Sequence, residues 1–432
     1  MTAAFREERL VEYVRDQRWF GARSSELTGA SLVDQAVLRE RPPLLDALVE
    51  LRYGSGAHDL YQLILDGAGA DVPGASEAGP EVVRLVRAAA RVPTADGEAA
   101  FEPFGDGLTG LPLERSRPLG AEQSNSSVVV DESALVKVYR RIEAGENPEL
   151  ETSRFLALHG FESMPALHGW WSYAGAPLAA TLGIVQEFLP DGADGWTLAL
   201  DELAARPGAF LERVPRLGEV VGAMHAALAS DGGDPAFAAE EVTGESLALA
   251  AASMDDEIAS VFLHLPDDEA VAPIAGHGEA VRDLLRDLTA IGSLARRIRN
   301  HGDLHLGQVL WARGDWLVID FEGEPARSLP ERRNKHSPLR DVAGMLRSFA
   351  YAAQVTGAPR DAEERARTAF LESYTTAVQG TGLLASPEVT ERLLRLFELE
   401  KAVYELRYEL SHRPDWVPVP VAGIVRLLEE AS

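Results

Sequence analysis

The feature that most constrains this chain is a pair of short apolar runs with polar side chains at their ends. The sequence reads HGDLHLGQVL at residues 301–310 and WLVIDFE at residues 316–322. If the two runs pair as a β-hairpin, Asp303, Gln308 and Asp320 lie at one end of it. An Asp that directly follows an apolar strand is poorly solvated, and a carboxylate beside an amide suits a hard cation such as Mg²⁺. Asp303 could then accept a proton from a hydroxyl, although loop aspartates also commonly satisfy the backbone of turns.

Charge and composition exclude several classes of protein. The chain has 41 basic and 68 acidic residues, a formal net charge of −27. Such a charge repels nucleic acids and anionic membrane surfaces, so we expect neither as a partner. Cysteine is absent, which excludes a thiolate nucleophile and a cysteine metal site. The start, MTAAFREERLVEYV, lacks the apolar core of a signal peptide, and no later run approaches the roughly 20 apolar residues of a membrane span. We expect a cytoplasmic protein.

The pattern along the chain predicts three parts. Residues 1–110 form an opening unit in which the Gly- and Ala-rich stretch 66–80 is expected to be a loop. Residues 111–189 contain the β-branched runs SVVV, ALVKVY and GIVQEFL with one helical pattern, which predicts a small sheet and a helix. Residues 190–432 repeat apolar residues at helical spacing. His225, on one of these helices, is expected to be a packed core histidine.

The polar residues around the predicted hairpin resemble a known pair of loops. His301-x-Asp303 with an amide five residues later, followed by an apolar strand that ends in Asp320, resembles the catalytic and metal-binding loops of protein-kinase-like phosphotransferases. Gln308 stands where protein kinases use Asn, and DFE replaces their Gly-terminated triplet. Both differences are usual in the aminoglycoside-phosphotransferase-like branch, which phosphorylates small molecules.

This resemblance implies a fold, two cofactors and several roles. The fold is α+β, a bilobal protein-kinase-like (aminoglycoside phosphotransferase-like) fold with an extra N-terminal cap subdomain over residues 1–110, a nucleotide-binding N-lobe over 111–189 and a mostly helical C-lobe over 190–432. The cofactors are ATP and Mg²⁺. The resemblance implies that Asp303 is the proton acceptor. Gln308 and Asp320 would be ligands of Mg²⁺, and His301 and Asp341 would support the catalytic loop.

The same resemblance requires nucleotide-binding residues in the small sheet. Lys137 in ALVKVY and Glu151 in the following helix are expected to form an ion pair that holds the α- and β-phosphates of ATP, since a lysine flanked by Leu and Val is untypical of a surface. The phosphate loop is expected at EQSNSSVVV, residues 122–130, which has no glycine repeat, so hydroxyls and backbone N–H groups would serve there. By order along the chain, VQEFLP would place its backbone against adenine. The residues concerned are Ser124, Asn125, Ser126 and Ser127 in the loop, and Gln186, Glu187 and Phe188 at the hinge.

Further motifs narrow the resemblance. IDFEGEP, SPLRDVAGMLRSF, KAVYELRYEL and RPDW, together with QRWFGARSSEL near the start, resemble the actinobacterial maltokinase-like proteins, a group that includes glucosamine kinases. This implies a kinase acting on a small sugar, with glucosamine as the preferred acceptor, giving glucosamine 6-phosphate, and maltose, giving maltose 1-phosphate, as the alternative. A catalytically inactive sugar-binding regulator is disfavoured because all the expected site residues are present. An aminoglycoside phosphotransferase is disfavoured by the cap and by IDFEGEP.

The acceptor is expected to bind near Asp303 on the helical lobe. Sugars favour aromatic faces and carboxylates, and an ammonium group would add a demand for negative charge. The candidate acceptor-binding residues are His305, Tyr404, Tyr408, Glu409 and Trp416. Alternatively, Glu405 and Glu409 lie on a solvated helix face. The cap is expected to bury Trp19 and Phe20 and to dock on the ATP-binding lobe without supplying a catalytic residue.

Overall fold

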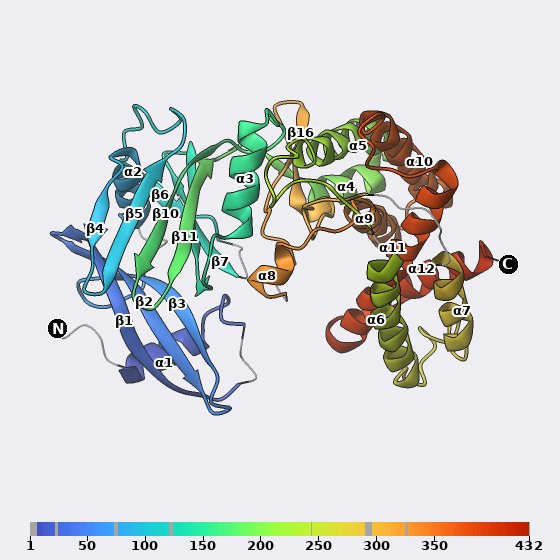
Figure 1. Cartoon of the computed structure of the whole chain (residues 1–432), viewed down its shortest axis with the longest axis horizontal. Helices are drawn as coiled ribbons and strands as arrows, with labels where there is room; N and C mark the ends of the chain where they lie inside the picture. Colours follow the sequence, from blue (N-terminus) through green and yellow to red (C-terminus); the bar gives the residue numbers. More distant parts are fainter. Residues whose placement is uncertain are drawn as a thin grey trace. The chain divides into compact units, whose positions relative to one another are not determined.

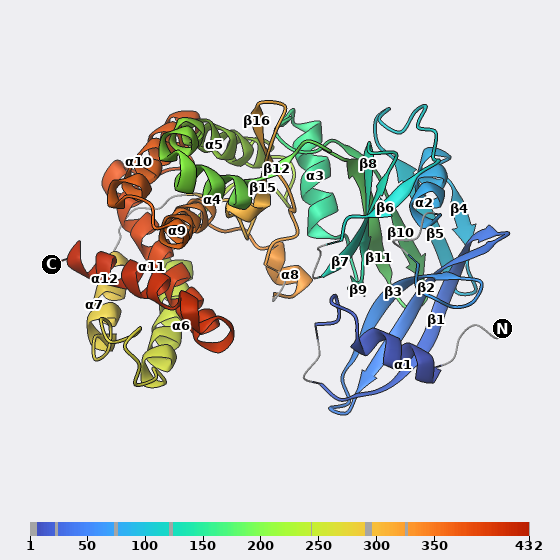
Figure 2. The same ribbon diagram turned by 180° about the vertical axis from the view of Figure 1, so that it is seen from behind.

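The computed structural model describes residues 7–21, 25–72, 77–120, 124–242, 244–289, 296–324 and 327–431. The chain forms two compact units. Unit 1 contains Met1–Ala157, Pro165–Asp191 and Pro325–Leu329, and unit 2 contains Leu158–Met164, Gly192–Glu324 and Pro330–Ser432. Figures 1 and 2 show the elements of both units from opposite sides.

The first part of unit 1 is an antiparallel sheet covered by one helix. The sheet has the order β1-β2-β3-β9, and the helix is α1 (Glu7–Arg15). Trp19 and Phe20 pack into the core of this sheet with exposed fractions of 8% and 2%, so their predicted burial is confirmed. The strands are β1 (Leu27–Glu40), β2 (Pro43–Tyr53), β3 (His58–Asp66) and β9 (Arg141–Ile142).

The second part of unit 1 is a larger sheet of order β4-β5-β10-β11-β8-β7-β6. Its central strands are buried on both faces over most of their length, which agrees with the nearly continuous apolar runs SVVV, ALVKVY and GIVQEFL. Helices α2 (Ala78–Arg87) and α3 (Pro148–Leu158) accompany it. The strands are β4 (Arg91–Pro93), β5 (Gly97–Pro103), β6 (Ser116–Pro118), β7 (Asn125–Val130), β8 (Ala134–Tyr139), β10 (Leu167–Gly175) and β11 (Ala179–Glu187).

The two sheets of unit 1 share one core. Leu44 and Ile64 of the first sheet belong to the same buried cluster as Trp171 and Ile184 of the second. All of β5 pairs with β10, so the chain has already entered the larger sheet before residue 110. The stretch 66–80, expected to be a loop, gives way to α2 at its end, and residues 73–76 lie outside the described part.

Three buried carboxylates connect the first sheet to its surroundings. Asp34 of β1 accepts hydrogen bonds from the hydroxyls of Thr94 (2.6 Å) and Tyr173 (2.7 Å). Asp46 of β2 accepts from the Trp171 indole at 3.1 Å. Asp71 pairs with the Arg140 guanidinium at 2.8 Å, directly after β8. Buried carboxylates with several donors fix a contact more specifically than apolar packing alone.

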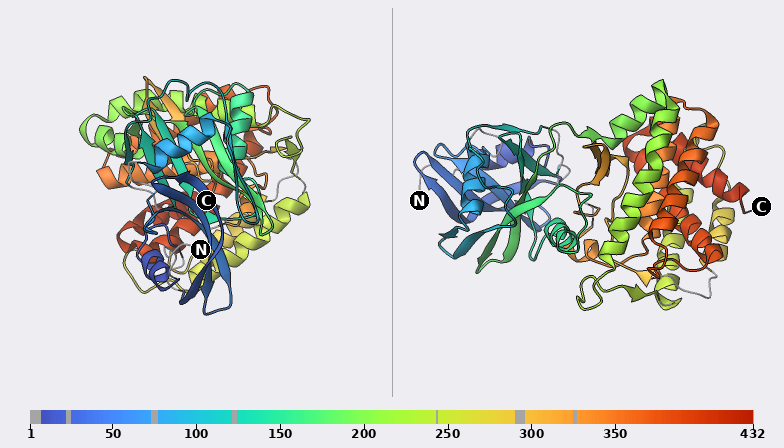
Figure 3. Two further views of the ribbon diagram at one scale, coloured as in Figure 1. Left: turned by 90° about the vertical axis from the view of Figure 1, so that its left-hand side faces the viewer. Right: turned by 90° about the horizontal axis from the view of Figure 1, so that it is seen from above.

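Unit 2 is mostly helical, as its periodicity predicts (Figure 3). Gly218 and Gly222 of α5 let α10 approach closely, because a Cβ at Gly218 would lie 2.5 Å from the Phe370 carbonyl oxygen. The helices are α4 (Gly195–Ala205), α5 (Pro207–Leu228), α6 (Gly244–Leu263), α7 (Gly278–Thr289), α9 (Leu339–Thr356), α10 (Arg360–Ala377), α11 (Pro387–His412) and α12 (Pro418–Glu429). The short helix α8 (Leu329–Arg332) begins in unit 1 and ends in unit 2.

The predicted hairpin of unit 2 is present. β15 (Val309–Ala312) pairs with β16 (Asp315–Val318), and β12 (Ala193–Asp194) adds a third strand. The 3₁₀ helix η1 (Leu306–Gln308) precedes β15, and a second one, η2 (Pro414–Trp416), follows α11. A separate antiparallel pair is formed by β13 (Glu240–Glu241) and β14 (Arg296–Arg297). None of the helices that the structure describes combines the length and the apolar content of a membrane-spanning helix.

Candidate active site

A buried aspartate holds the loop that carries Asp303. Asp341, in the first turn of α9, accepts hydrogen bonds from the backbone N–H groups of His301 (2.8 Å) and Gly302 (3.0 Å). Gly302 has φ +86°, a conformation that glycine adopts without strain. The two carboxylate oxygens therefore fix the backbone immediately before Asp303, the supporting role expected for Asp341.

A histidine from a distant helix supports Asp341 in turn. His225 of α5 is fully buried, as expected, with Nε2 3.1 Å from Asp341 and Nδ1 3.0 Å from the Tyr374 hydroxyl. Burial alone would raise the pKa of Asp341, but the hydrogen bond and charge of His225 and the N–H of Gly302 hold it below its usual range. Asp341 therefore stays ionised at neutral pH. The sequence predicted the burial of His225 and gave no sign of this contact.

His301 joins the catalytic loop to the end of β16. Its Nε2 lies 2.8 Å from the Ile319 carbonyl, and its Nδ1 receives the Asp303 N–H at 3.3 Å. A carbonyl can only accept, so Nε2 donates this hydrogen bond. His301 thus orients Asp303 relative to the residue that precedes Asp320.

The Asp303 carboxylate itself is partly open, with 25% of the side chain exposed. Oδ1 lies 3.8 Å from the Lys401 ammonium, and Oδ2 lies 3.9 Å from Nε2 of His305. Both distances exceed hydrogen-bonding range, so both oxygens can still accept a proton or a hydrogen bond from a ligand.

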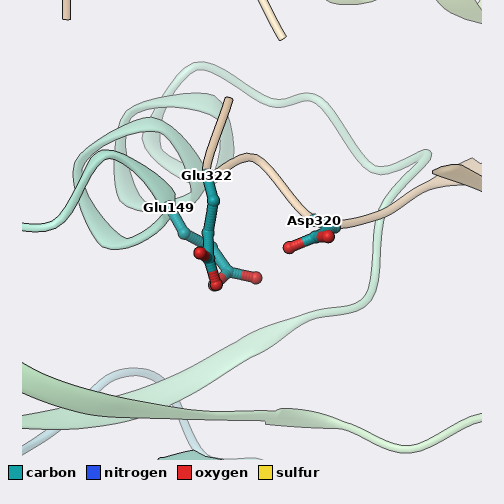
Figure 4. Close-up of side chains that lie close together, drawn as sticks. All are labelled: Glu149, Asp320 and Glu322. Carbon is teal, nitrogen blue, oxygen red and sulfur yellow. The ribbon is translucent and has the colours of Figure 1, made fainter. Parts of the chain in front are cut away.

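The loop after β16 carries a second carboxylate that the sequence analysis missed. Asp320 has φ +64°, and Glu322 follows two residues later, with one oxygen within 4.8 Å of an Asp320 oxygen. Figure 4 shows the Asp320 carboxylate pointing toward that of Glu322; the third residue it labels, Glu149, belongs to unit 1. The carbonyl of Gln308 accepts the Ile319 N–H at 3.0 Å, so η1 lies beside this loop. Oxygen donors of this kind fit Mg²⁺. The signal for Glu322 was the DFE triplet itself.

In unit 1, Lys137 forms a buried ion pair with Glu149. Its Nζ lies 2.9 Å from Glu149 Oε2, and the same oxygen accepts a hydrogen bond from the Tyr139 hydroxyl at 2.9 Å. The pair of Lys137 with Glu151 that the sequence predicts stays a prediction. Residues two apart on a helix differ by about 200° in direction, so choosing between the two depends on how α3 is rotated. Tyr139 was also missed, although it shares one face of β8 with Lys137.

The expected phosphate loop is a strand over most of its length. Asn125, Ser126 and Ser127 lie in β7, and Ser124 directly precedes it, while residues 122 and 123 lie outside the described part. The Ser126 hydroxyl accepts a hydrogen bond from Arg140 Nε at 2.8 Å. Ser126 therefore binds the guanidinium that pairs with Asp71.

The expected hinge residues end β11, and two of their backbone donors are used within unit 1. The Glu187 N–H donates to the Ala166 carbonyl at 2.8 Å, and the Phe188 N–H donates to the Ser133 carbonyl at 2.9 Å. Gln186 pairs with Leu135 of β8. The N–H groups of Glu187 and Phe188 are therefore used within unit 1, and a contact of the hinge backbone with adenine stays a prediction.

On α11, the two glutamates considered for sugar binding are buried in ion pairs. Glu405 lies 2.7 Å from Arg347 of α9. Glu409, only 2% exposed, lies 2.7 Å from Arg413 and accepts a hydrogen bond from the Tyr351 hydroxyl at 3.2 Å. Glu409 is thus neither a solvated residue nor an open sugar ligand, since helical spacing puts it on the face that packs in the core.

The adjacent side of α11 carries Lys401 and Tyr404. Tyr404 donates a hydrogen bond to Glu324, and burial, with the nearby Glu324 charge, raises the pKa of Tyr404 to about 12. The Lys401 ammonium lies 5.4 Å from the centre of the Tyr404 ring. Tyr404 was predicted from the sequence as an acceptor-binding residue, whereas Lys401 and Glu324 were not. Glu324 lies in the motif IDFEGEP.

Tyr408 and Trp416, two further acceptor candidates, pack against other rings. Tyr408 is 41% exposed and stacks on His412, with ring centres 4.5 Å apart. Trp416 of η2 packs against Tyr351 at 5.6 Å and against Trp196 of α4 at 6.3 Å. No contact that the structure describes assigns either residue to Asp303, and both remain candidates.

The chain is similar to several known proteins. The Streptacidiphilus jiangxiensis protein named glucosamine kinase is 32% identical over 428 residues, covering 90% of this chain and 92% of that protein. The Mycolicibacterium smegmatis protein of the same name is 33% identical over 336 residues, 73% of this chain and 80% of that one. A solved structure of a glucosamine kinase in complex with glucosamine, ADP and inorganic phosphate matches with a TM-score of 0.73 and 24% identity, over 97% of this chain and 99% of that one. This likeness confirms the expected fold class.

Two family profiles divide the chain between them. The maltokinase N-terminal cap domain matches residues 13–95, and the phosphotransferase enzyme family matches residues 115–383. The second match contains Lys137, Asp303, Asp320 and Asp341, and the first ends close to where the chain enters the larger sheet. The chain therefore belongs to the phosphotransferase enzyme family and carries a maltokinase-type N-terminal cap domain.

Proposed function

We propose that this chain is an ATP- and Mg²⁺-dependent kinase that phosphorylates a hydroxyl of glucosamine, giving glucosamine 6-phosphate. The observation that carries the proposal is Asp303, held on a loop fixed by Asp341 and His301 with both of its oxygens open. Membership of a phosphotransferase family and two relatives named glucosamine kinase support it. A small sugar would be the partner, and a supply of ATP points to the cytoplasm.

In the proposed mechanism, Asp303 orients the acceptor hydroxyl and accepts its proton. The rigid backbone before Asp303 presents the carboxylate in one direction, which lowers the entropic cost of the reaction. Asp320, Glu322 and Gln308 supply oxygen donors for Mg²⁺, which neutralises phosphate charge when bound. Lys137, fixed by Glu149 and Tyr139, would hold the nucleotide phosphates.

The preference for glucosamine rests on charge beside Asp303. Glu324 bonds to Tyr404, and the Asp303 charge also acts on Tyr404, so the two carboxylates lie in one region of unit 2. Carboxylates attract the ammonium group of glucosamine, and Tyr404 offers an aromatic face to the sugar ring. His305, Tyr408 and Trp416 remain further acceptor candidates. Maltose is the alternative, favoured by the cap profile, but it is neutral and would make no use of this charge.

An ADP-release assay with ATP and Mg²⁺ tests the proposal. Glucosamine, glucose, maltose and kanamycin are compared as acceptors at equal concentration, and the phosphorylated product is identified by NMR. We expect glucosamine to give the largest kcat/KM. A preference for maltose would favour the alternative, and the absence of acceptor-dependent ADP release would contradict the kinase proposal and favour a sugar-binding regulator.

A further inference from the structure

Lys401 is a cation placed beside the proposed proton acceptor by a helix far along the chain. It lies on α11, and its Nζ is 3.8 Å from Asp303 Oδ1. The side chain is 35% exposed and lies over the Tyr404 ring, with Nζ 5.4 Å from the ring centre. The ring limits where the stem can go, while the ammonium keeps its hydrogens for another acceptor.

The other basic side chain near Asp303 is His305, whose pKa lies below its usual value. Nδ1 of His305 accepts the Gly307 N–H at 3.0 Å, so the proton of the neutral ring is on Nε2, the nitrogen 3.9 Å from Asp303. Burial lowers the pKa of His305, and the positive charge of Lys401 adds to the effect, although Asp303 opposes it. Lys401 is thus the charged group of this pair.

The other cations that meet α11 are engaged more tightly. Arg347, Arg367 and Arg413 each form an ion pair of 2.7 Å or less with a buried glutamate of this helix. These pairs hold the helix in the core. The Lys401 ammonium instead lies 3.8 Å from the partly exposed carboxylate of Asp303. This separation is longer than a hydrogen bond, so a ligand oxygen can contact both groups.

We infer that Lys401 is a further catalytic residue, whose ammonium contacts the phosphoryl group while it is transferred to the acceptor. The inference rests on the proposed kinase function. In the transfer, the acceptor oxygen forms a bond to the γ-phosphorus, the bond from that phosphorus to the β,γ-bridging oxygen breaks, and ADP leaves. The hydroxyl proton moves to Asp303, which becomes neutral. Lys401 then faces the new phosphate ester in place of a carboxylate, so its attraction to the transferred group grows as the reaction proceeds.

The test compares Lys401→Met and Lys401→Arg with Arg407→Met in the full chain. Arg407 is the matched control, because its guanidinium also lies 5.4 Å from the Tyr404 ring but pairs with Glu257 at 3.0 Å. We expect Lys401→Met to lower kcat by about 10- to 100-fold and to weaken inhibition by glucosamine 6-phosphate about tenfold. The KM values for ATP and glucosamine should stay within about twofold, and Lys401→Arg should retain most of the activity. Arg407→Met should behave nearly as the wild type.

Two results would overturn the inference. One is a Lys401→Met variant with near-normal kcat and product inhibition. The other is a variant whose KM for glucosamine alone changes, which would assign Lys401 to a hydroxyl of the sugar instead of the phosphate. If Lys401→Met melts well below the wild type, Lys401→Gln replaces it in the comparison. Wild-type protein that phosphorylates no acceptor would contradict the proposed function itself, which distinguishes that failure from this one.

Discussion

At the scale of single residues, two aspartates of unit 2 have opposite surroundings and therefore different uses. Asp341 is 2% exposed and receives two backbone N–H groups and an imidazole. Asp303 is 25% exposed and lies 3.8 Å or more from its charged neighbours. The oxygens of Asp341 accept hydrogen bonds from the loop, whereas the oxygens of Asp303 can still accept hydrogen bonds from a ligand.

Replacing Asp303 by Asn tests this difference. The change keeps the shape of the side chain but removes the proton acceptor, so turnover should fall by roughly 10² to 10⁴ while ATP binding persists. Steady-state kinetics and calorimetric titration of ATP measure the two effects. Asp315→Asn, at an exposed hairpin position of the same unit, is the control. Near-normal turnover of Asp303→Asn would remove Asp303 from its role.

The two glutamates of α3 give a second residue-scale prediction. Glu149 contacts Lys137 and Tyr139, so Glu149→Gln should release the lysine and raise the KM for ATP about tenfold, equivalent to ~1.4 kcal/mol of binding. Glu151→Gln, at a second buried position of the same helix, should change this KM less. The two variants are compared at saturating acceptor. A larger increase of this KM in Glu151→Gln than in Glu149→Gln would favour Glu151 as the partner of Lys137.

Asp46 gives a prediction about pH. Burial raises the pKa of this carboxyl to about 6 from 3.8, against the effect of the Gln62 and Trp171 hydrogen bonds. A raised pKa means that the folded protein binds the proton more tightly, so this stabilisation is complete below pH 4 and is lost as pH rises through 6. The wild type should lose on the order of 3 kcal/mol of unfolding free energy over this pH range, and the Asp46→Asn variant should not. The melting temperature of the variant relative to that of the wild type should therefore rise between pH 5 and pH 7.5.

Asp34→Asn is the control for this pH series. Burial acts to raise the pKa of Asp34, but hydrogen bonds from Thr94 and Tyr173 hold it below its usual range. A lowered pKa contributes stability above the unfolded value, so this variant should be no better, relative to wild type, at pH 7.5 than at pH 5. Parallel pH curves for wild type and Asp46→Asn would contradict the assignment.

At the scale of elements, α11 has two polar faces with different functions. One face carries Glu398, Glu405 and Glu409, each buried against an arginine. The other carries Lys401 and Tyr404 toward Asp303 and Glu324. Apolar periodicity predicted the helix, but it could not separate the faces, because a buried glutamate and a solvated one read alike until the arginine partner is known.

A double-mutant cycle tests the buried pair of Arg347 and Glu405. Glu405→Ala leaves the Arg347 charge uncompensated in the core and should destabilise the protein by about 3–5 kcal/mol. Arg347→Met with Glu405→Leu should recover most of that loss, because neither side chain is then charged. Thermal unfolding followed by circular dichroism gives the values. If the double variant is no more stable than Glu405→Ala, the pair does not act as a unit.

At the scale of the whole molecule, the sequence predicted the parts better than the contacts between them. The hairpin beside Asp303, the strand of Lys137 and the helical second half all follow from local patterns. The partner of Lys137, the contact of His225 with Asp341 and the approach of Lys401 to Asp303 are contacts between distant segments, which no local pattern encodes. The pairing of β5 with β10 is a contact of the same kind, and the cap boundary near residue 110 stays a prediction.

The first sheet is an integral part of unit 1, and this makes its removal a test of the whole architecture. A chain that starts near residue 110 lacks β1, β2 and β3 of the first sheet as well as α2, β4 and β5. It therefore exposes the cluster around Trp171 and leaves β10 as a sheet edge. Exposed apolar surface beside an open edge promotes aggregation. We expect this chain to aggregate or to melt well below the full protein, while Val37→Ser, at an exposed position of β1, should melt normally. Light scattering and thermal unfolding decide. A truncated chain that is soluble, equally heat-stable and fully active would instead make the cap an independent domain with a role outside catalysis.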